Sequence, residues 1–168
     1  MNLISKTLLS LALVVPAVGC GGGMSKQDAM TGWAAANVAL SQAFAQAQTM
    51  GGGLHNDATA TLNFTYNCPG GGGTIAITGS ADTSTPGMES VDVTEKATGC
   101  KSNNITLDGT MSYKTVVNGS AVNFKWTGSL TFSGQVSGTC DIDVTVNSSG
   151  TGGSVTGTIC GYSLSAAG

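Results

Sequence analysis

Hydrophobic residues follow two different periods along the chain, and the change of period separates a helical segment from a sheet. From Lys26 to about Met50 the sequence is rich in alanine, and larger apolar residues recur every three or four positions. These residues are Met30, Trp33, Leu40, Phe44 and Ala47. The spacing predicts one apolar stripe on an amphipathic helix. Ser25 with Asp28 three positions later is typical of an N-terminal cap, and Gly51 begins the glycine run that ends the helix.

Beyond residue 58 apolar and polar residues alternate, which is the pattern of strands with one buried face. Seven alternating segments are separated by turn signals such as Asn118-Gly119. Their apolar positions are Leu62, Phe64 and Tyr66; Ile75 and Ile77; Val91 and Val93; Ile105, Leu107, Met111 and Tyr113; Val122, Phe124, Trp126, Leu130 and Phe132; Ile142, Val144 and Val146; and Val155 and Ile159. Gly109 and Gly128 stand among these positions, where a glycine often marks a bend or a close approach of two backbones.

We therefore predict an α+β fold, in which a long N-terminal helix packs on a curved, mostly antiparallel β-meander of about seven strands. Residues 25–53 form the helical part and residues 54–168 the sheet part of one domain. Connections of hairpin length favour antiparallel neighbours. The alternative for the helix is a position on a membrane or a partner, but a membrane-surface helix is usually rich in basic residues, and this one has only Lys26.

The first nineteen residues have the three parts of a secretion signal. Lys6 precedes a short apolar run, and small residues stand before Cys20. The run is shorter than the ~20 residues that span a bilayer. The segment 13–20, LVVPAVGC, resembles the lipobox of bacterial lipoproteins, although Ala17 stands where leucine is usual.

This resemblance implies that Cys20 is lipid-modified, that residues 1–19 are removed as a lipoprotein signal peptide, and that residues 20–24 form a lipidated tether. Gly21 after the cysteine, in place of aspartate, favours the outer membrane, with the domain facing the periplasm or the cell surface. Three acyl chains on this cysteine would anchor the protein in the membrane almost irreversibly, since each CH₂ group buried in the bilayer contributes ~0.8 kcal/mol. The alternative is an ordinary secretion signal, with Cys20 as a disulfide partner.

Four cysteines remain when Cys20 is set aside, and in an exported chain an even number indicates two disulfides. We favour Cys68–Cys100 and Cys140–Cys160 among the three possible connectivities. The second pair closes a hairpin-like loop, although the valines of its two strands align better in a register shifted by one residue, which a bulge would reconcile. A four-cysteine zinc site is the less favoured alternative, because no two cysteines have the close spacing of zinc ligands.

The charge of the chain limits its partners. Six lysines stand against nine acidic residues, and the chain contains no arginine. Nucleic-acid binding is disfavoured, since affinity there comes from neutralising phosphates. Clamping of an anion by a bidentate guanidinium is excluded.

Few residues are candidates for chemistry. His55 is the one histidine and stands in a predicted loop, where a solvated side chain is the usual state. Asp141 and Asp143 flank Ile142, so they share the solvent face of a strand, where they could bind Ca²⁺ weakly or act on a glycosidic bond. A charged outer face is the simpler explanation. The same explanation applies to a second acidic stretch, Glu89, Asp92 and Glu95 with Lys96. The glycine run 70–73 lacks the lysine of a phosphate loop, so we expect it to be a flexible hairpin.

We accordingly assign no catalytic, cofactor-binding or metal site and expect no cofactor. The leading prediction is a non-enzymatic envelope lipoprotein, an interaction or structural domain held at the membrane through Cys20. The alternative is a carrier of a small apolar ligand or lipid, because a curved sheet and a helix can enclose an apolar cavity. An enzyme acting on glycans is the least favoured possibility. The possible partners are thus the membrane, an envelope protein or an apolar ligand.

Overall fold

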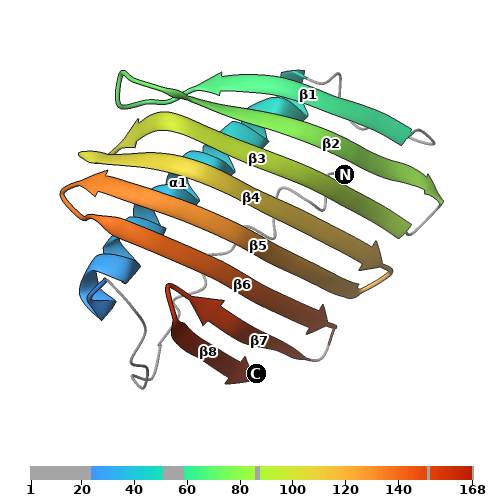
Figure 1. The fold of residues 1–168 in the computed structure, drawn as a ribbon. Helices are drawn as coiled ribbons and strands as arrows, with labels where there is room; N and C mark the ends of the chain where they lie inside the picture. The colour runs from blue at the N-terminus through green and yellow to red at the C-terminus, as the bar shows by residue number, and fades with distance from the viewer. Residues whose placement is uncertain (1–23, 51–58, 86–87, 151, 168) are drawn as a thin grey trace.

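The computed structural model describes residues 24–50, 59–85, 88–150 and 152–167. One helix precedes eight strands, and Figure 1 shows the strands side by side in chain order. The elements are α1 (Lys26–Met50), β1 (Thr59–Asn67), β2 (Thr74–Thr85), β3 (Met88–Ser102), β4 (Ile105–Asn118), β5 (Ala121–Gly134), β6 (Gly138–Ser149), β7 (Gly152–Ile159) and β8 (Tyr162–Ala167). Every neighbouring pair is antiparallel. The sheet is therefore one open meander with β1 and β8 at its edges.

The predicted α+β class, with a long helix as the counterpart of about seven strands, is wrong. The fold is β-rich, with about 70% strand against 16% helix, and the sheet has eight strands. The helix approaches β1, β2, β3 and β4 most closely, so it is a minor element beside part of the sheet. Its buried positions are mostly alanine, which adds little apolar area to the core. Most of the structure is therefore formed by the paired strands and the side chains that they bury.

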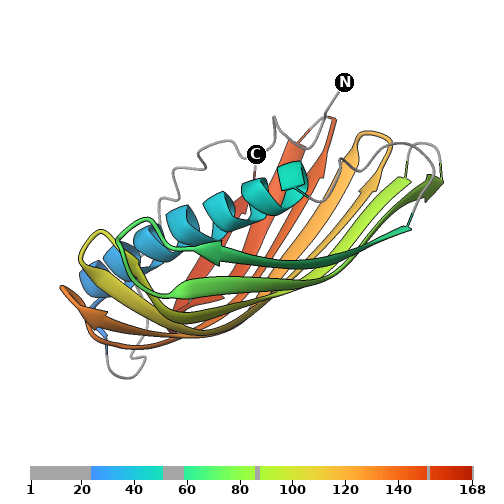
Figure 2. The same ribbon diagram turned by 90° about the horizontal axis from the view of Figure 1, so that it is seen from above.

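The helix buries only part of the predicted stripe: Leu40 is buried, and Trp33 and Phe44 pack against the core. Met30 of that stripe is 50% exposed. The buried helical side chains are Ala29, Ala35, Ala36, Ala39, Leu40 and Ala43. Small residues let the helix backbone lie close to its neighbours: a Cβ on Gly32 would lie 3.2 Å from the ring of Phe132. Figure 2 shows the helix running obliquely along the concave side of the sheet. The sheet extends past the C-terminal end of α1.

Local sequence explains where the helix begins. The Ser25 hydroxyl accepts a hydrogen bond from the backbone N–H of Asp28 at 3.1 Å and donates one to the Asp28 carboxylate at 2.7 Å. This satisfies one of the backbone donors that the first helical turn leaves free. The residue before the cap is also fixed, because the Tyr162 hydroxyl of β8 donates to the carbonyl of Met24 at 2.9 Å.

The alternating positions of the strands form the core on the concave side of the sheet. Its largest fully buried side chains are Phe132, Ile75, Ile77, Ile105, Leu107, Met111 and Leu130. Gly109 and Gly128 stand on the same face, and both have positive φ, 136° and 154°. A Cβ at either residue would lie 2.2 Å from a backbone oxygen of the neighbouring strand, so the close approach predicted at these two glycines is present. We call this concave side the inner face.

The two disulfides join Cys68 to Cys100 and Cys140 to Cys160, which is the connectivity that the sequence favours. The strands β6 and β7 pair in the shifted register, with Val146 opposite Val155. An irregular backbone at Cys160, where φ is 52°, reconciles this register with the disulfide. Its N–H donates to the carbonyl of residue 141 at 2.8 Å, so the strand end turns without leaving the sheet.

Candidate functional site

The inner face carries a cluster of five aromatic rings that are only half-buried, which we call the aromatic cluster. Two rings come from the helix and three from the strands β4 and β5: Trp33, Phe44, Tyr113, Phe124 and Trp126. Alternation along the strands places the last three on the inner face, together with the core. A half-buried cluster of large rings differs from the fully buried core around Phe132, since part of each ring surface is open to contact.

Tyr113 is the centre of this cluster. Its ring centroid lies 5.4 Å from that of Phe44, 5.7 Å from that of Phe124 and 6.0 Å from that of Trp126. The Trp126 ring meets Trp33 edge-on at 5.6 Å, with an interplanar angle of 72°. Such tilted and edge-on pairs are favourable, but they leave parts of the ring faces without an aromatic partner. Burial raises the pKa of the Tyr113 hydroxyl above its ordinary value, so this residue is uncharged near neutral pH.

Glu95 is a buried acid beside this cluster. It stands on β3 opposite Ile77 of β2 and Met111 of β4, and it is 5% exposed. Desolvation raises the pKa of its carboxyl from 4.5 to about 8. Tyr113, the diagonal neighbour of Glu95 across the β3–β4 pair, lies close enough for the negative charge of Glu95 to raise the tyrosine pKa further. Within the part of the chain that the structure describes, no hydrogen bond or ion pair to the Glu95 carboxyl occurs.

Two more polar atoms of the inner face lack partners in the described structure. They are Oε2 of Glu89 on β3 and Oγ1 of Thr115 on β4, and both are buried. The two residues are diagonal neighbours, since Glu89 stands opposite Val117 and Thr115 opposite Val91. A buried polar atom without a partner is costly and uncommon, and it often marks a place where another group binds.

The second acidic stretch was predicted to lie on the solvent face, and this is wrong for Glu89 and Glu95. Only Asp92 and Lys96 point outward. The strand alternates, so residues 89 and 95 share the face of the buried Val91 and Val93. The period of two was therefore the signal that could have placed these acids correctly.

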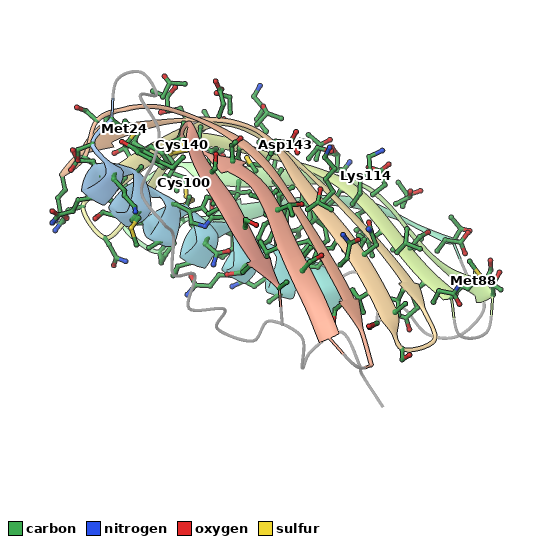
Figure 3. The ribbon with its side chains drawn as sticks, turned by 90° about the horizontal axis from the view of Figure 1, so that it is seen from below. Met24, Met88, Cys100, Lys114, Cys140 and Asp143 are labelled. Atoms are coloured by element: carbon green, nitrogen blue, oxygen red, sulfur yellow. A yellow bond between two sulfur atoms is a disulfide. The ribbon has the colours of Figure 1, made fainter. Side chains whose placement is uncertain are left out.

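The other predicted acidic pair lies on the convex side of the sheet, which we call the outer face. Asp141 and Asp143 are both exposed, and Asp143 forms an ion pair with Lys125 of β5 at 3.3 Å. Lys114 pairs in the same way with Asp92 at 2.7 Å. Figure 3 shows Lys114 and Asp143 projecting from the convex side of the sheet, away from the helix. The two aspartates 141 and 143 are not brought together with any other candidate residue.

The glycine run 70–73 is held in place rather than being a free hairpin. The N–H of Gly70 donates to the carbonyl of Lys101 at 3.1 Å, and the N–H of Lys101 donates to the carbonyl of Gly72 at 2.9 Å. A Cβ at Gly73, where φ is 74°, would lie 2.0 Å from a backbone oxygen of Gly99. These glycines therefore allow a turn to pack against the end of β3. The remaining sequence candidates, His55 and Cys20, lie outside the described residues.

A second surface lies beside the N-terminal half of α1, near the start of β4. It is an open depression of about 410 Å³, lined by Met30, Thr31, Ala34, Ala35, Val38, Asn103, Ile105 and Gln135. It contains no titratable side chain among these lining residues. Its chemistry is therefore less specific than that of the inner face.

Comparison with protein-family models, with curated proteins and with solved structures gives no match. Within the described ranges, three or more metal-ligating side chains nowhere gather in one place. The described helix is not long and apolar enough to cross a membrane.

Proposed function

We propose that the protein is a non-enzymatic lipoprotein, anchored in the outer membrane through Cys20, whose domain binds a small apolar ligand or lipid on the inner face of the sheet. The aromatic cluster is the observation that carries this proposal. Five large rings at one place, each half-buried, offer an apolar surface to a ligand, and binding sites are usually lined in this way by aromatic side chains with a few polar groups.

The lipobox-like segment before Cys20 supports the anchor, and the fixed position of Met24 adds to this. Met24 is 5% exposed and accepts the hydrogen bond from Tyr162. Only three residues separate Met24 from Cys20, so the distance between the two is at most about 15 Å even for an extended chain. A lipid on Cys20 would therefore hold the domain close to the membrane, on its periplasmic or cell-surface side.

The two tryptophans give a direct test of ligand binding. Trp33 and Trp126 are the only tryptophans of the chain, and both belong to the aromatic cluster. Lipid copurifying with the mature protein would be identified by mass spectrometry after solvent extraction. A fatty alcohol with bromine in its alkyl chain should quench the tryptophan fluorescence, since bromine quenches only on contact.

Matched variants separate specific from general binding. Phe124→Ala removes one ring of the cluster and should weaken the quenching about tenfold or more, because a buried aromatic side chain contributes roughly 2 kcal/mol of apolar contact. Val116→Ala removes an exposed apolar side chain on the neighbouring strand and should leave binding unchanged. Equal quenching in both variants, or none in the parent protein, would show that the inner face is not a ligand site.

The anchor is tested separately in cells. The variant Cys20→Ser should move the protein from the membrane fraction to the soluble envelope fraction and abolish its labelling by palmitate. A Cys20→Ser protein that stays in the membrane fraction would refute the lipid anchor without affecting the ligand proposal.

A second candidate function is interaction with another envelope protein through the edge of the sheet. The strand β1, with sequence TATLNFTYN, contains no charged residue and no proline, which edge strands usually carry against unwanted pairing. It could accept a strand from a partner. A photo-crosslinker placed in cells at the exposed Asn63 of β1 should then give a protein adduct, and one at Asp143 on the outer face should not. Adducts from both positions, or from neither, would count against this function.

A further inference from the structure

Among the described residues, the inner face carries acidic side chains but no basic one. Glu89 and Glu95 are its acidic residues. The lysines of the described strands are exposed: Lys114 and Lys125 pair with aspartates on the outer face, and Lys96 and Lys101 also point to solvent. The described part of the inner face therefore favours a positive charge over a negative one.

Glu95 combines burial with the absence of a partner. It is 5% exposed, and neither a donor nor a cation among the described residues meets its carboxyl. Ile77 and Met111 stand opposite it on the neighbouring strands, and the buried face of α1 consists of alanine and leucine. The described residues thus give an ionised carboxylate at this position no partner, and a cation or donor that offsets its desolvation would have to come from outside them.

The aromatic cluster favours the same kind of ligand. Tyr113, at its centre, is the diagonal neighbour of Glu95. The faces of tryptophan, tyrosine and phenylalanine rings attract cations, and sites that bind ammonium groups commonly join such rings to an acid. Rings without the acid would bind any apolar molecule, and the acid without the rings would lack the apolar contact.

We propose that the inner face selects ligands in which an ammonium group is attached to an apolar body, and that Glu95 is the carboxyl that meets the ammonium group. This inference rests on the proposed ligand-binding function and adds the chemical class of the ligand. The apolar body lies against the aromatic cluster, and the ammonium group lies against the Glu95 carboxylate. The unpartnered Oε2 of Glu89 offers a further acceptor on the same face.

Binding of this kind requires that Glu95 be ionised, so a proton leaves to solvent when an ammonium ion binds at neutral pH. The affinity for a permanently charged ammonium should therefore rise with pH and level off above the carboxyl's pKa of about 8. Two other titratable groups are relevant on the described strands: Tyr113 on β4, whose pKa is raised by burial, and Glu89 on β3. The inner-facing described residues of β2 and the buried face of α1 contribute none.

Three probes with equal apolar chains test the selectivity. Decyltrimethylammonium, decanol and decanoate, all below their micelle concentrations, would be titrated into the lipidated, full-length mature protein with tryptophan fluorescence as the signal. At about pH 8.5 we expect the ammonium probe to bind about tenfold more tightly than decanol, as a charge-assisted contact gives, and decanoate to bind most weakly. Equal affinity for the three probes would overturn this inference and leave the ligand-binding function standing. No binding of any probe would overturn both.

Two substitutions that each remove one negative charge test whether Glu95 is the residue that meets the ammonium group. Glu95→Gln should reduce the affinity for the ammonium probe about tenfold, leave that for decanol unchanged and remove the rise with pH. Asp92→Asn removes one negative charge from the outer face of the same strand and should change none of these values. If the two variants lose affinity equally, the selectivity comes from net charge, and the assignment of Glu95 is wrong.

Discussion

The substitution Glu95→Gln should stabilise the protein at alkaline pH. The Glu95 carboxyl has a pKa of about 8 in the folded state, against an ordinary value of 4.5. Because the folded pKa is the higher one, the folded state keeps a proton that the unfolded state releases, and stability is lost as pH rises between these values. Each unit of difference corresponds to about 1.4 kcal/mol, so the free energy of unfolding should fall by about 5 kcal/mol from about pH 4 to about pH 9. That is a large fraction of the ~5–15 kcal/mol of a typical domain.

Urea unfolding at a series of pH values, followed by tryptophan fluorescence with the disulfides intact, measures this effect. At about pH 4 the parent protein and Glu95→Gln should agree within about 1 kcal/mol, because a protonated carboxyl and an amide are similar in size and polarity. At about pH 9 the variant should be the more stable by about 5 kcal/mol. Asp92→Asn is the control and should show the same fall as the parent. A parent protein whose stability does not fall over this range would refute the burial of an unpartnered acid at position 95.

Further substitutions test the fold. Gly128→Ala should cost about 2–4 kcal/mol in urea unfolding, because its φ is 154° and a Cβ would meet a backbone oxygen at 2.2 Å; a cost below about 1 kcal/mol would contradict that close approach. Replacing Cys68 and Cys100 together by serine should cost about 3 kcal/mol, and a variant as stable as the parent would mean that this disulfide does not form. Leu107→Ala in the core should cost about 2–5 kcal/mol, whereas Val116→Ala at the surface should cost less than about 0.5 kcal/mol; equal costs would contradict the assigned inner face.

Features that depend on neighbouring residues were predictable from the sequence. The turn at Asn118-Gly119 connects β4 and β5, and the Ser25 cap begins the helix. The eighth strand, β8, is absent from the prediction because it is short: the alternation in YSLSAA covers few residues, and only Leu164 is a buried apolar residue. It forms because β7 offers an unpaired edge, which is a property of the sheet and not of the segment.

The side of an element that is buried was harder to predict than the element itself. The predicted helical stripe contains the largest apolar residues, but Met30 is half-exposed and most of the buried helical residues are alanines. Close approach favours small residues at a contact, so residue size was a poor guide to burial there. The prediction for the acidic stretch is wrong for a related reason: residues close in the sequence need not share one surface, because a strand points Asp92 outward and Glu95 inward.

The stability of the empty protein and its proposed selectivity have one physical origin. Desolvation makes ionised Glu95 unfavourable in the folded state, and a bound ammonium group would remove that cost by pairing with the carboxylate. A ligand that binds only the folded state with ionised Glu95 must therefore stabilise the protein most where the empty protein is least stable, above about pH 8. A neutral ligand on the same aromatic rings adds a stabilisation that does not depend on pH. The pH dependence of ligand-induced stabilisation thus separates a site built around Glu95 from a merely apolar one, whatever the natural ligand is.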